Sequence, residues 1–153
     1  MLIDIKEHRQ HRINSPRVLA DIANNILWKE EMLDRDKEHF WAVGMNTGNS
    51  IRYIDLISLG SNSSAIVHPR EVFRRAIAEG INKLIFIHNH PSGRTIASKE
   101  DRDICKKLVY TGDVIGIQVL DFMIIGNTEN REESVEYYSF QDAETLRNGI
   151  KEV

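Results

Sequence analysis

The sequence predicts an α/β protein, a single layered domain in which helices flank a mixed β-sheet. Apolar residues at helical spacing alternate along the chain with short β-rich runs that end at turn residues. Two of these runs are separated by the turn signal Asn46-Thr47-Gly48-Asn49 and form a predicted hairpin, which makes the sheet mixed rather than all parallel. The length of 153 residues, of which 41% are hydrophobic, suits one domain with an adequate core.

The charge of the chain argues against a polyanionic partner. The formal net charge is -3 and the pI is about 6.1, so nucleic-acid binding is open but not favoured. Residues 1–8 carry charges where a signal peptide needs an uninterrupted apolar run, and no later run reaches membrane-spanning length. A cytoplasmic location without a membrane partner is therefore expected. The single cysteine, Cys105, cannot form an internal disulfide and is expected to be a small core residue.

The N-terminal half is predicted to contain an arm, a helix and the hairpin. Residues 1–14 are expected to form a mobile arm or an added edge strand ahead of the domain at 15–153. Ser15-Pro16 is a helix-start signal, and apolar residues at helical spacing extend the predicted helix over 15–33. The elements that follow are strands at 38–45 and 51–58, a loop at 59–64 and a short strand at 65–67.

The C-terminal half is predicted to alternate helices and strands. Pro69 and Gly80 bound one helix. The inward face of that helix is expected to consist of apolar residues, namely Val72, Phe73, Ala76 and Ile77. The later elements are a buried strand at 83–87 that ends at two histidines, a helix at 99–111 closed by Gly112, a strand at 114–125, a polar surface segment at 127–136, a segment at 137–140 without an assigned element type, and a short C-terminal helix.

Two histidines and an aspartate have the spacing of metal ligands. His88 and His90 follow the buried strand, and side chains two apart on a strand share a face. A turn follows, and a helix that opens at Ser98 could swing the carboxylate of Asp101 back towards the histidines. Two imidazoles and one carboxylate leave a fourth tetrahedral position open, which is the arrangement of a catalytic zinc.

Each of these residues also has a purely structural interpretation. Two histidines at i and i+2 of a strand are by themselves more often surface or hydrogen-bonded residues than ligands. Ser98 and Asp101 have the spacing of a capping box at a helix start, a role that is compatible with the metal-site interpretation for Ser98. His68 lies outside the metal spacing and is expected to have a turn or cap role.

The spacing His-x-His, seven residues, Ser, two residues, Asp resembles the JAMM motif of the JAB/MPN metalloproteases. Further stretches resemble the bacterial RadC family: Val67-His68-Pro69-Arg70-Glu71-Val72-Phe73-Arg74, His88-Asn89-His90-Pro91-Ser92-Gly93, Leu120-Asp121 with Ile124-Ile125-Gly126, and Tyr137-Tyr138-Ser139-Phe140. The resemblance implies a JAB/MPN-like domain of cytidine-deaminase-like architecture, with a catalytic core at about residues 34–140.

The resemblance also implies a role for each site residue. One zinc ion per chain would be held by His88, His90 and Asp101 and would activate a water for cleavage of a peptide or isopeptide bond in an unknown peptide or protein substrate. Glu38 matches the family's upstream glutamate and would be the general base, although an acid at a strand start is by itself most often solvated. Ser98 would donate a hydrogen bond to the oxyanion or orient the water. The family name is attached to DNA repair.

The sequence departs from the RadC pattern at two places. Phe122 stands where the family usually has a histidine, which removes an imidazole near the substrate or the ligands. The loop at 94–97 lacks the family's usual Asp-Pro stretch. RadC proteins also commonly carry an N-terminal helical module, and we do not expect these 153 residues to contain it as well.

Two other functions remain open at this point. The domain could be a non-catalytic module that binds protein or DNA in repair or mobile-element maintenance. It could also be a metal-dependent nuclease, which needs phosphate-directed cations near the metal, and Arg94 is the obvious candidate in the loop. A zinc nucleoside deaminase is disfavoured because its Pro-Cys-x-x-Cys ligand pair is missing.

Overall fold

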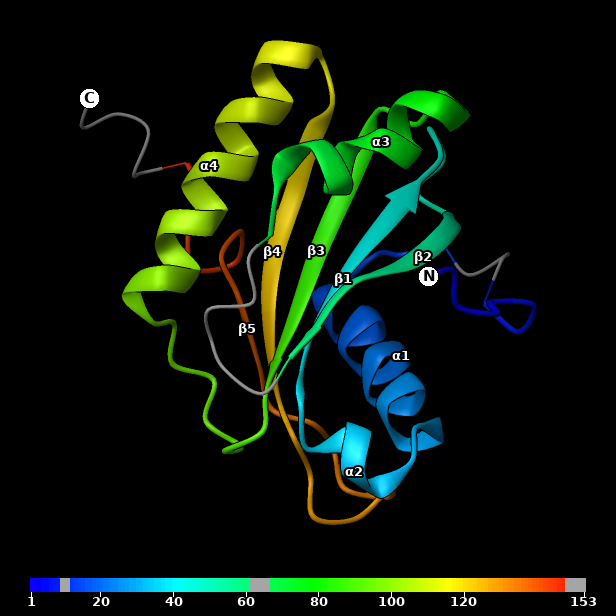
Figure 1. The fold of residues 1–153 in the computed structure, drawn as a ribbon, viewed down its shortest axis with the longest axis vertical. Coiled ribbons are helices and arrows are strands. Elements are labelled where there is room, and N and C mark those ends of the chain that lie inside the picture. Colours follow the sequence, from blue (N-terminus) through cyan, green and yellow to red (C-terminus); the bar gives the residue numbers. More distant parts are fainter. Residues whose placement is uncertain (9–11, 61–66, 148–153) are drawn as a thin grey trace.

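A five-stranded mixed sheet forms the centre of the molecule (Figure 1). The computed structural model describes residues 1–8, 12–60 and 67–147. The sheet has the order β2-β1-β3-β4-β5, and its strands are β1 (Glu38–Met45), β2 (Ile51–Gly60), β3 (Lys83–His90), β4 (Gln118–Gly126) and β5 (Tyr137–Ser139). β3 and β4 are parallel, whereas the other three neighbouring pairs are antiparallel. The predicted mixed α/β class and the predicted hairpin of β1 and β2 are therefore confirmed.

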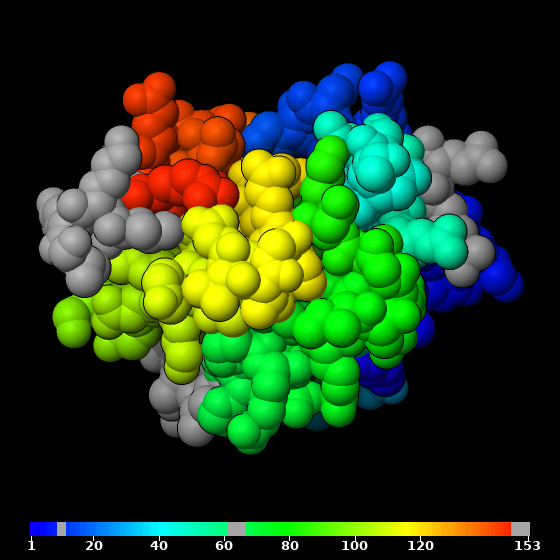
Figure 2. Space-filling view, turned by 90° about the horizontal axis from the view of Figure 1, so that it is seen from above, coloured from blue at the N-terminus to red at the C-terminus, as the bar shows by residue number. Residues whose placement is uncertain are grey.

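Helices cover both faces of this sheet. Those in the described ranges are α1 (Pro16–Lys29), α2 (Met32–Arg35), α3 (Pro69–Glu79) and α4 (Lys99–Ile115). α1 packs on one face, and α3 and α4 pack on the other. Viewed from above, the C-terminal end of α4 (yellow) meets α3 (green), as Figure 2 shows. None of these helices has the length and apolar character needed to cross a bilayer.

Strand alternation divides the core into two layers. Along β3, Leu84 and Phe86 pack beneath α3 and α4, whereas Ile85 and Ile87 pack against α1. Because both faces are covered, the central strands are apolar on both sides rather than alternately apolar and polar. Continuing this alternation places His88 and His90 on the side of α3 and α4 and turns Asn89 towards α1.

The crossover from β3 through α4 to β4 brings the ends of several elements together. Parallel strands need such a long connection, and here α4 supplies it. Because α4 starts directly after the loop that leaves β3, its first turn lies near the carboxyl end of that strand. β1 runs antiparallel to β3, with Phe40 opposite His88, so Glu38 starts β1 at the same end of the sheet. The fold thus brings the predicted site residues together at one end of the central strands.

The expected helix at 15–33 is two helices, and the strand before the histidines is longer than predicted. Glu30 and Glu31 have extended backbone angles, with ψ of 155° and 152°, so α1 ends at Lys29 and a short α2 follows. β3 continues through both histidines, because its pairing with β1 and β4 extends that far. Periodicity in the sequence does not show where neighbouring strands stop pairing.

The predicted end of the helix at Gly112 is wrong. α4 runs to Ile115 and ends at Gly116, whose φ of 78° is the left-handed conformation that favours glycine. A Cβ at Gly112 would overlap the carbonyl oxygen of Ile117, so that glycine allows close packing instead of stopping the helix. Val114, expected in a strand, is consequently helical and exposed, and β4 begins only at Gln118.

Other expectations fail locally or fall outside the described residues. Ile77, placed on the inner face of α3, is 65% exposed, because it lies one position beyond the stripe of α3 that packs inward. Residues 140–147 form turns rather than the start of a C-terminal helix, and 148–153 lie outside the described ranges. The predicted loop and short strand across 59–67 fall mostly on 61–66, which are also outside them. In the N-terminal arm, Leu2 and Arg12 each form a single antiparallel bridge, to Asp55 and Ser50.

Candidate metal centre

The structure brings the three predicted ligands together. One ligand atom from each of His88, His90 and Asp101 lies within 4.8 Å of the other two. The Asp101 carboxylate faces both rings: Oδ2 lies 3.1 Å from Nε2 of His90, and Oδ1 lies 3.7 Å from Nε2 of His88. His88 and Asp101 are buried and His90 is partly buried. Two imidazole nitrogens and a carboxylate oxygen suit zinc among the divalent ions of cells.

Backbone carbonyls fix the orientation of both rings. Nδ1 of His88 donates to the carbonyl oxygen of His39 at 2.9 Å, and Nδ1 of His90 donates to that of Arg94 at 2.9 Å. A carbonyl can only accept, so each Nδ1 carries the proton and each neutral ring has its lone pair on Nε2. Metal-binding histidines are commonly held in this way by an acceptor on the nitrogen that does not bind the ion. Both Nε2 atoms face Asp101.

The electrostatics of the cluster keep Asp101 charged and shift the pKa values of the two histidines in opposite directions. Burial would raise the pKa of Asp101, but hydrogen bonds from His90 and Ser98 outweigh it and lower that pKa. Burial lowers the pKa of His88 and favours the neutral ring. The hydrogen bond with Asp101 raises the pKa of His90 and favours its protonated ring, in which Nε2 donates to the carboxylate; a metal ion would take the place of that proton. A negative carboxylate between two imidazoles is the charge state that binds a divalent cation.

Glu38 reaches the same cluster from β1. Its Oε2 lies 3.9 Å from Nε2 of His88, and its side chain is 17% exposed. That oxygen is buried and has no hydrogen-bond partner in the described part of the chain. Buried carboxylate oxygens are costly to leave unpaired, so the arrangement fits a site in which an ion and its water occupy the space beside Glu38. The donor set and this orphaned oxygen therefore both fit a metal ion.

Ser98 forms the capping box that the sequence predicted. Its Oγ accepts from the backbone N–H of Asp101 at 3.0 Å, and its own N–H donates to Oδ2 of Asp101 at 2.8 Å. The cap does not withdraw the aspartate from the cluster, because the same carboxylate faces both histidines. Capping and metal binding are thus compatible for Asp101 as well as for Ser98, and the cap orients the carboxylate. The catalytic role of Ser98 stays a prediction.

Several contributors to the site carry no signal in the sequence. The carbonyls of His39 and Arg94 orient the ligands through backbone atoms, which any residue could supply. Asn127 directly follows β4 and bonds both Asn89 and the carbonyl of Arg35. The sequence indicates a site role for Asn127 only through its position directly after a predicted strand.

Phe122 forms part of the apolar floor of the site. It is 1% exposed, lines the small hollow that contains Glu38, His88 and Asp101, and packs against Phe40 with ring centroids 5.8 Å apart. Where the resemblance expects an imidazole, this chain therefore places an aromatic hydrocarbon beneath the ligands. The floor excludes water from the inner side of the cluster, which strengthens electrostatic interactions within it.

This mixed sheet, with its His-His-Asp cluster at the carboxyl end of β3 and a glutamate on the neighbouring strand, is the architecture of a JAB-like domain. A family model described as RadC-like JAB domain matches residues 13–146. The chain belongs to that family.

Curated relatives support the same assignment. A UPF0758 protein of Caldanaerobacter subterraneus is 44% identical over 79% of this chain and 52% of its own length. One of Desulfitobacterium hafniense is 46% identical over 75% of this chain and 48% of its own, and one of Bacillus cereus is 40% identical over 82% and 54%. The chain thus spans about half the length of these relatives.

Proposed function

We propose that this domain is a zinc-dependent hydrolase of the JAMM type that cleaves a peptide or isopeptide bond. The observation that carries the proposal is the convergence of both Nε2 atoms on Asp101 while both Nδ1 atoms are held by carbonyls. His88, His90 and Asp101 would hold one ion. Bound there, zinc supplies a Lewis acid that polarises a carbonyl and makes a water nucleophilic near neutral pH.

Residues of the chain supply the proton transfers and the positioning. Glu38 accepts a proton from the attacking water and passes it to the leaving amine, which is the work of a general base that becomes a general acid. Its unpaired Oε2 beside His88 supports this role. Ser98 donates from its hydroxyl to the oxyanion that develops on the substrate carbonyl. Phe122 keeps bulk water away from the inner side of the site.

The test begins with elemental analysis of untagged protein purified without chelators. The parent is expected to bind about one zinc per chain, and His88→Ala and Asp101→Asn are expected to lose it. Matched controls are His68→Ala, a helix N-cap whose side chain makes no capping bond, and Asp103→Asn, an exposed residue on α4. Both controls should retain zinc. A parent that stays metal-free after zinc is supplied would overturn the proposal and leave the non-catalytic module.

Hydrolysis is then assayed on a mixed peptide library and on lysine-linked isopeptides. Glu38→Gln should keep the zinc and lose turnover by at least about a hundredfold, because general-base catalysis is worth that much. Cleavage of single-stranded or duplex DNA with no peptide cleavage would instead support the nuclease. Unchanged peptide turnover in Glu38→Gln would remove Glu38 from the mechanism.

A further inference from the structure

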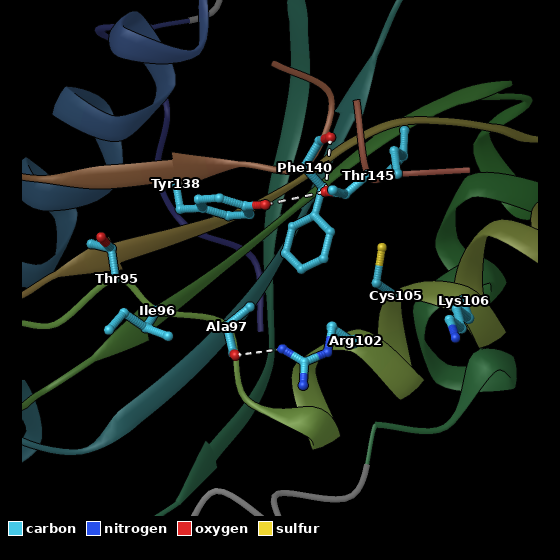
Figure 3. A pocket seen from close by; sticks show the side chains of 10 residues that line it. Thr95, Ile96, Ala97, Arg102, Cys105, Lys106, Tyr138, Phe140 and Thr145 are labelled. Atoms are coloured by element: carbon cyan, nitrogen blue, oxygen red, sulfur yellow. Dashed lines mark hydrogen bonds between the residues drawn. The ribbon is translucent and has the colours of Figure 1, made fainter. Parts of the chain in front are cut away.

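A second hollow, of about 520 Å³, lies beside the ligand loop, residues 91–97, which connects His90 at the end of β3 to Ser98 before α4. Figure 3 shows its two walls: Thr95, Ile96 and Ala97 with Arg102 on one side, and Tyr138 and Thr145 on the other. Apart from Arg102, which lies on α4, the first wall belongs to the segment between His90 and Ser98. A molecule bound against this wall therefore touches the loop that connects the predicted ligand His90 to Ser98, the N-cap of the helix that carries Asp101.

The floor of this hollow is apolar. Cys105, Phe140 and Leu146 line it and are each at most 3% exposed as whole residues, so they present rigid, well-packed surface. The ring of Tyr138 packs edge-on against Phe140, with centroids 5.2 Å apart, and its hydroxyl hydrogen-bonds with Thr145. Preformed apolar hollows with a few polar groups at the edge are the usual form of a ligand site.

Two cations stand at the edge of the hollow, and neither has a carboxylate partner in the described part of the chain. Arg102 and Lys106 lie four apart on α4, so they share a face of the helix. In the described ranges neither forms an ion pair, whereas Lys99 on the same helix pairs with Asp103 at 3.6 Å. Arg102 donates from Nη1 to the carbonyl of Ala97 at 2.9 Å and keeps further guanidinium donors for a ligand. An apolar floor below two cations that lack carboxylate partners among the described residues fits an apolar group that carries a carboxylate.

We infer that this hollow is a substrate subsite that binds an acidic peptide segment, in which an apolar side chain fills the floor and a neighbouring carboxylate meets Arg102 and Lys106. The inference rests on the proposed peptide hydrolysis and names its substrate class. The wall at 95–97 ends directly before Ser98, so a peptide held here lies across the ligand loop. Arg102 thereby acts as a specificity residue and also anchors the loop through Ala97.

The test is an NMR titration of the zinc-loaded, ¹⁵N-labelled full chain. The probes are acetyl-Phe-Glu-N-methylamide and its neutral counterpart acetyl-Phe-Gln-N-methylamide. The acidic probe should shift the backbone amides of Thr95, Ile96 and Arg102 and bind about tenfold more tightly than the neutral one, because charge-assisted hydrogen bonds are the stronger kind. Equal affinity of the two probes, or shifts confined to other parts of the chain, would overturn the inference.

Variants that each remove one positive charge show which residues cause the preference for the acidic probe. Arg102→Gln and Lys106→Gln should each reduce the preference for the acidic probe by about threefold or more. Lys107→Gln makes the same charge change on α4 outside the hollow, and it should leave the preference unchanged. If Lys107→Gln reduced the preference for the acidic probe by the same factor, the preference would depend only on the net charge of the protein, and the subsite would be overturned. Lys106→Gln keeps the test valid if Arg102→Gln disturbs the loop.

The readout also separates this inference from the proposed function. Binding is measured without turnover and is repeated in Glu38→Gln, so preferential binding of the acidic probe supports the subsite even if no bond is cleaved. Inorganic phosphate is titrated in parallel. Tighter binding of phosphate than of the acidic probe at the same amides would overturn the peptide assignment and point to a nucleic-acid backbone.

Discussion

Asn89 holds the backbone on both sides of Glu38. Its Oδ1 accepts from the N–H of His39, and its Nδ2 donates to the carbonyl of Lys37 at 3.1 Å and to Oδ1 of Asn127 at 3.0 Å. Asn89 is fully buried and faces α1, on the side of the sheet opposite the two histidines. Asn89, which lies between the two predicted histidine ligands, therefore holds the backbone of Glu38, the proposed general base, from the opposite face of the sheet.

Replacing Asn89 by leucine is expected to lower stability and activity but to spare metal binding. Leucine has a similar volume but leaves the buried N–H of His39 without an acceptor, which should reduce the free energy of unfolding by about 2 to 4 kcal/mol. Zinc content should stay near that of the parent, because His88 and His90 lie on the other face. Turnover should fall at least about tenfold as Glu38 loses its fixed position. Urea unfolding, elemental analysis and the peptide assay measure the three effects.

Asn24→Leu is the matched control for that variant. Asn24 is a buried asparagine on α1 whose Oδ1 has no hydrogen-bond partner among the described residues. Its replacement by leucine removes an unpaired polar atom, so stability should be unchanged or higher and turnover unchanged. A loss of stability in Asn24→Leu as large as that in Asn89→Leu would show that position 89 is sensitive only because it is buried.

Gly126→Ala is expected to weaken zinc binding through the ligand loop. A Cβ at Gly126 would overlap the backbone carbonyl of Gly93, and Gly93 in turn bonds the carbonyl of His90 at 3.0 Å. The added methyl must therefore push the loop away from β4 and move His90. Zinc affinity should fall about tenfold or more, as measured by competition with a chromogenic chelator, because ligand placement tolerates little displacement.

Gly112→Ala is the control for Gly126→Ala, because it adds a similar backbone overlap without displacing the ligand loop. Its Cβ would overlap the carbonyl of Ile117 in the same way, but at the far end of α4 from the site. Both variants should lose about 1 to 3 kcal/mol of stability as overpacked substitutions, and only Gly126→Ala should lose zinc affinity. Equal zinc affinities in the two variants would argue against a link between Gly126 and the site.

Cys105 is expected to make stability fall at alkaline pH. Burial raises the pKa of its thiol to about 12, whereas the unfolded chain should have a thiol pKa near 8.5. Below about pH 8.5 both states keep the proton, so stability is unaffected. As the pH rises towards 12 the unfolded state ionises first, and folding loses free energy.

The measurement compares urea unfolding of the parent and Cys105→Ala at pH 7 and pH 10. The parent should lose about 2 kcal/mol more than the variant over this interval. Burial also raises the pKa of Tyr53, but that residue is present in both proteins and cancels from the comparison. Identical losses would mean that the thiol ionises as readily in the folded state as in the unfolded one.

The sequence predicted element types better than element ends. Helical and strand periodicity located α1, α3, α4 and the strands β1 to β4, but it missed the short α2, the strand β5 and the correct start of β4. The errors at Gly112 and Val114 have one cause: a glycine can end a helix or allow a neighbouring backbone to approach, and only the position of Ile117 shows that the second applies. The exposure of Ile77 has another cause: it lies one position beyond the stripe of α3 that packs inward, and the sequence pattern does not show where that stripe ends.

The sequence by itself determined which residues can bind a metal, because the spacing His-x-His along a strand and Ser-x-x-Asp at a helix start encode faces and caps through local geometry. Tertiary structure decided how that potential is used. Pairing of β1 with β3 brought Glu38, fifty residues before His88, beside its ring. Backbone carbonyls selected the imidazole tautomers, Asn89 anchored the strand of Glu38 from the opposite face, and the packing of 138–146 against α4 formed the second hollow. Except for the bond between His90 and Arg94, these contacts join segments far apart in the chain, and no local pattern records them.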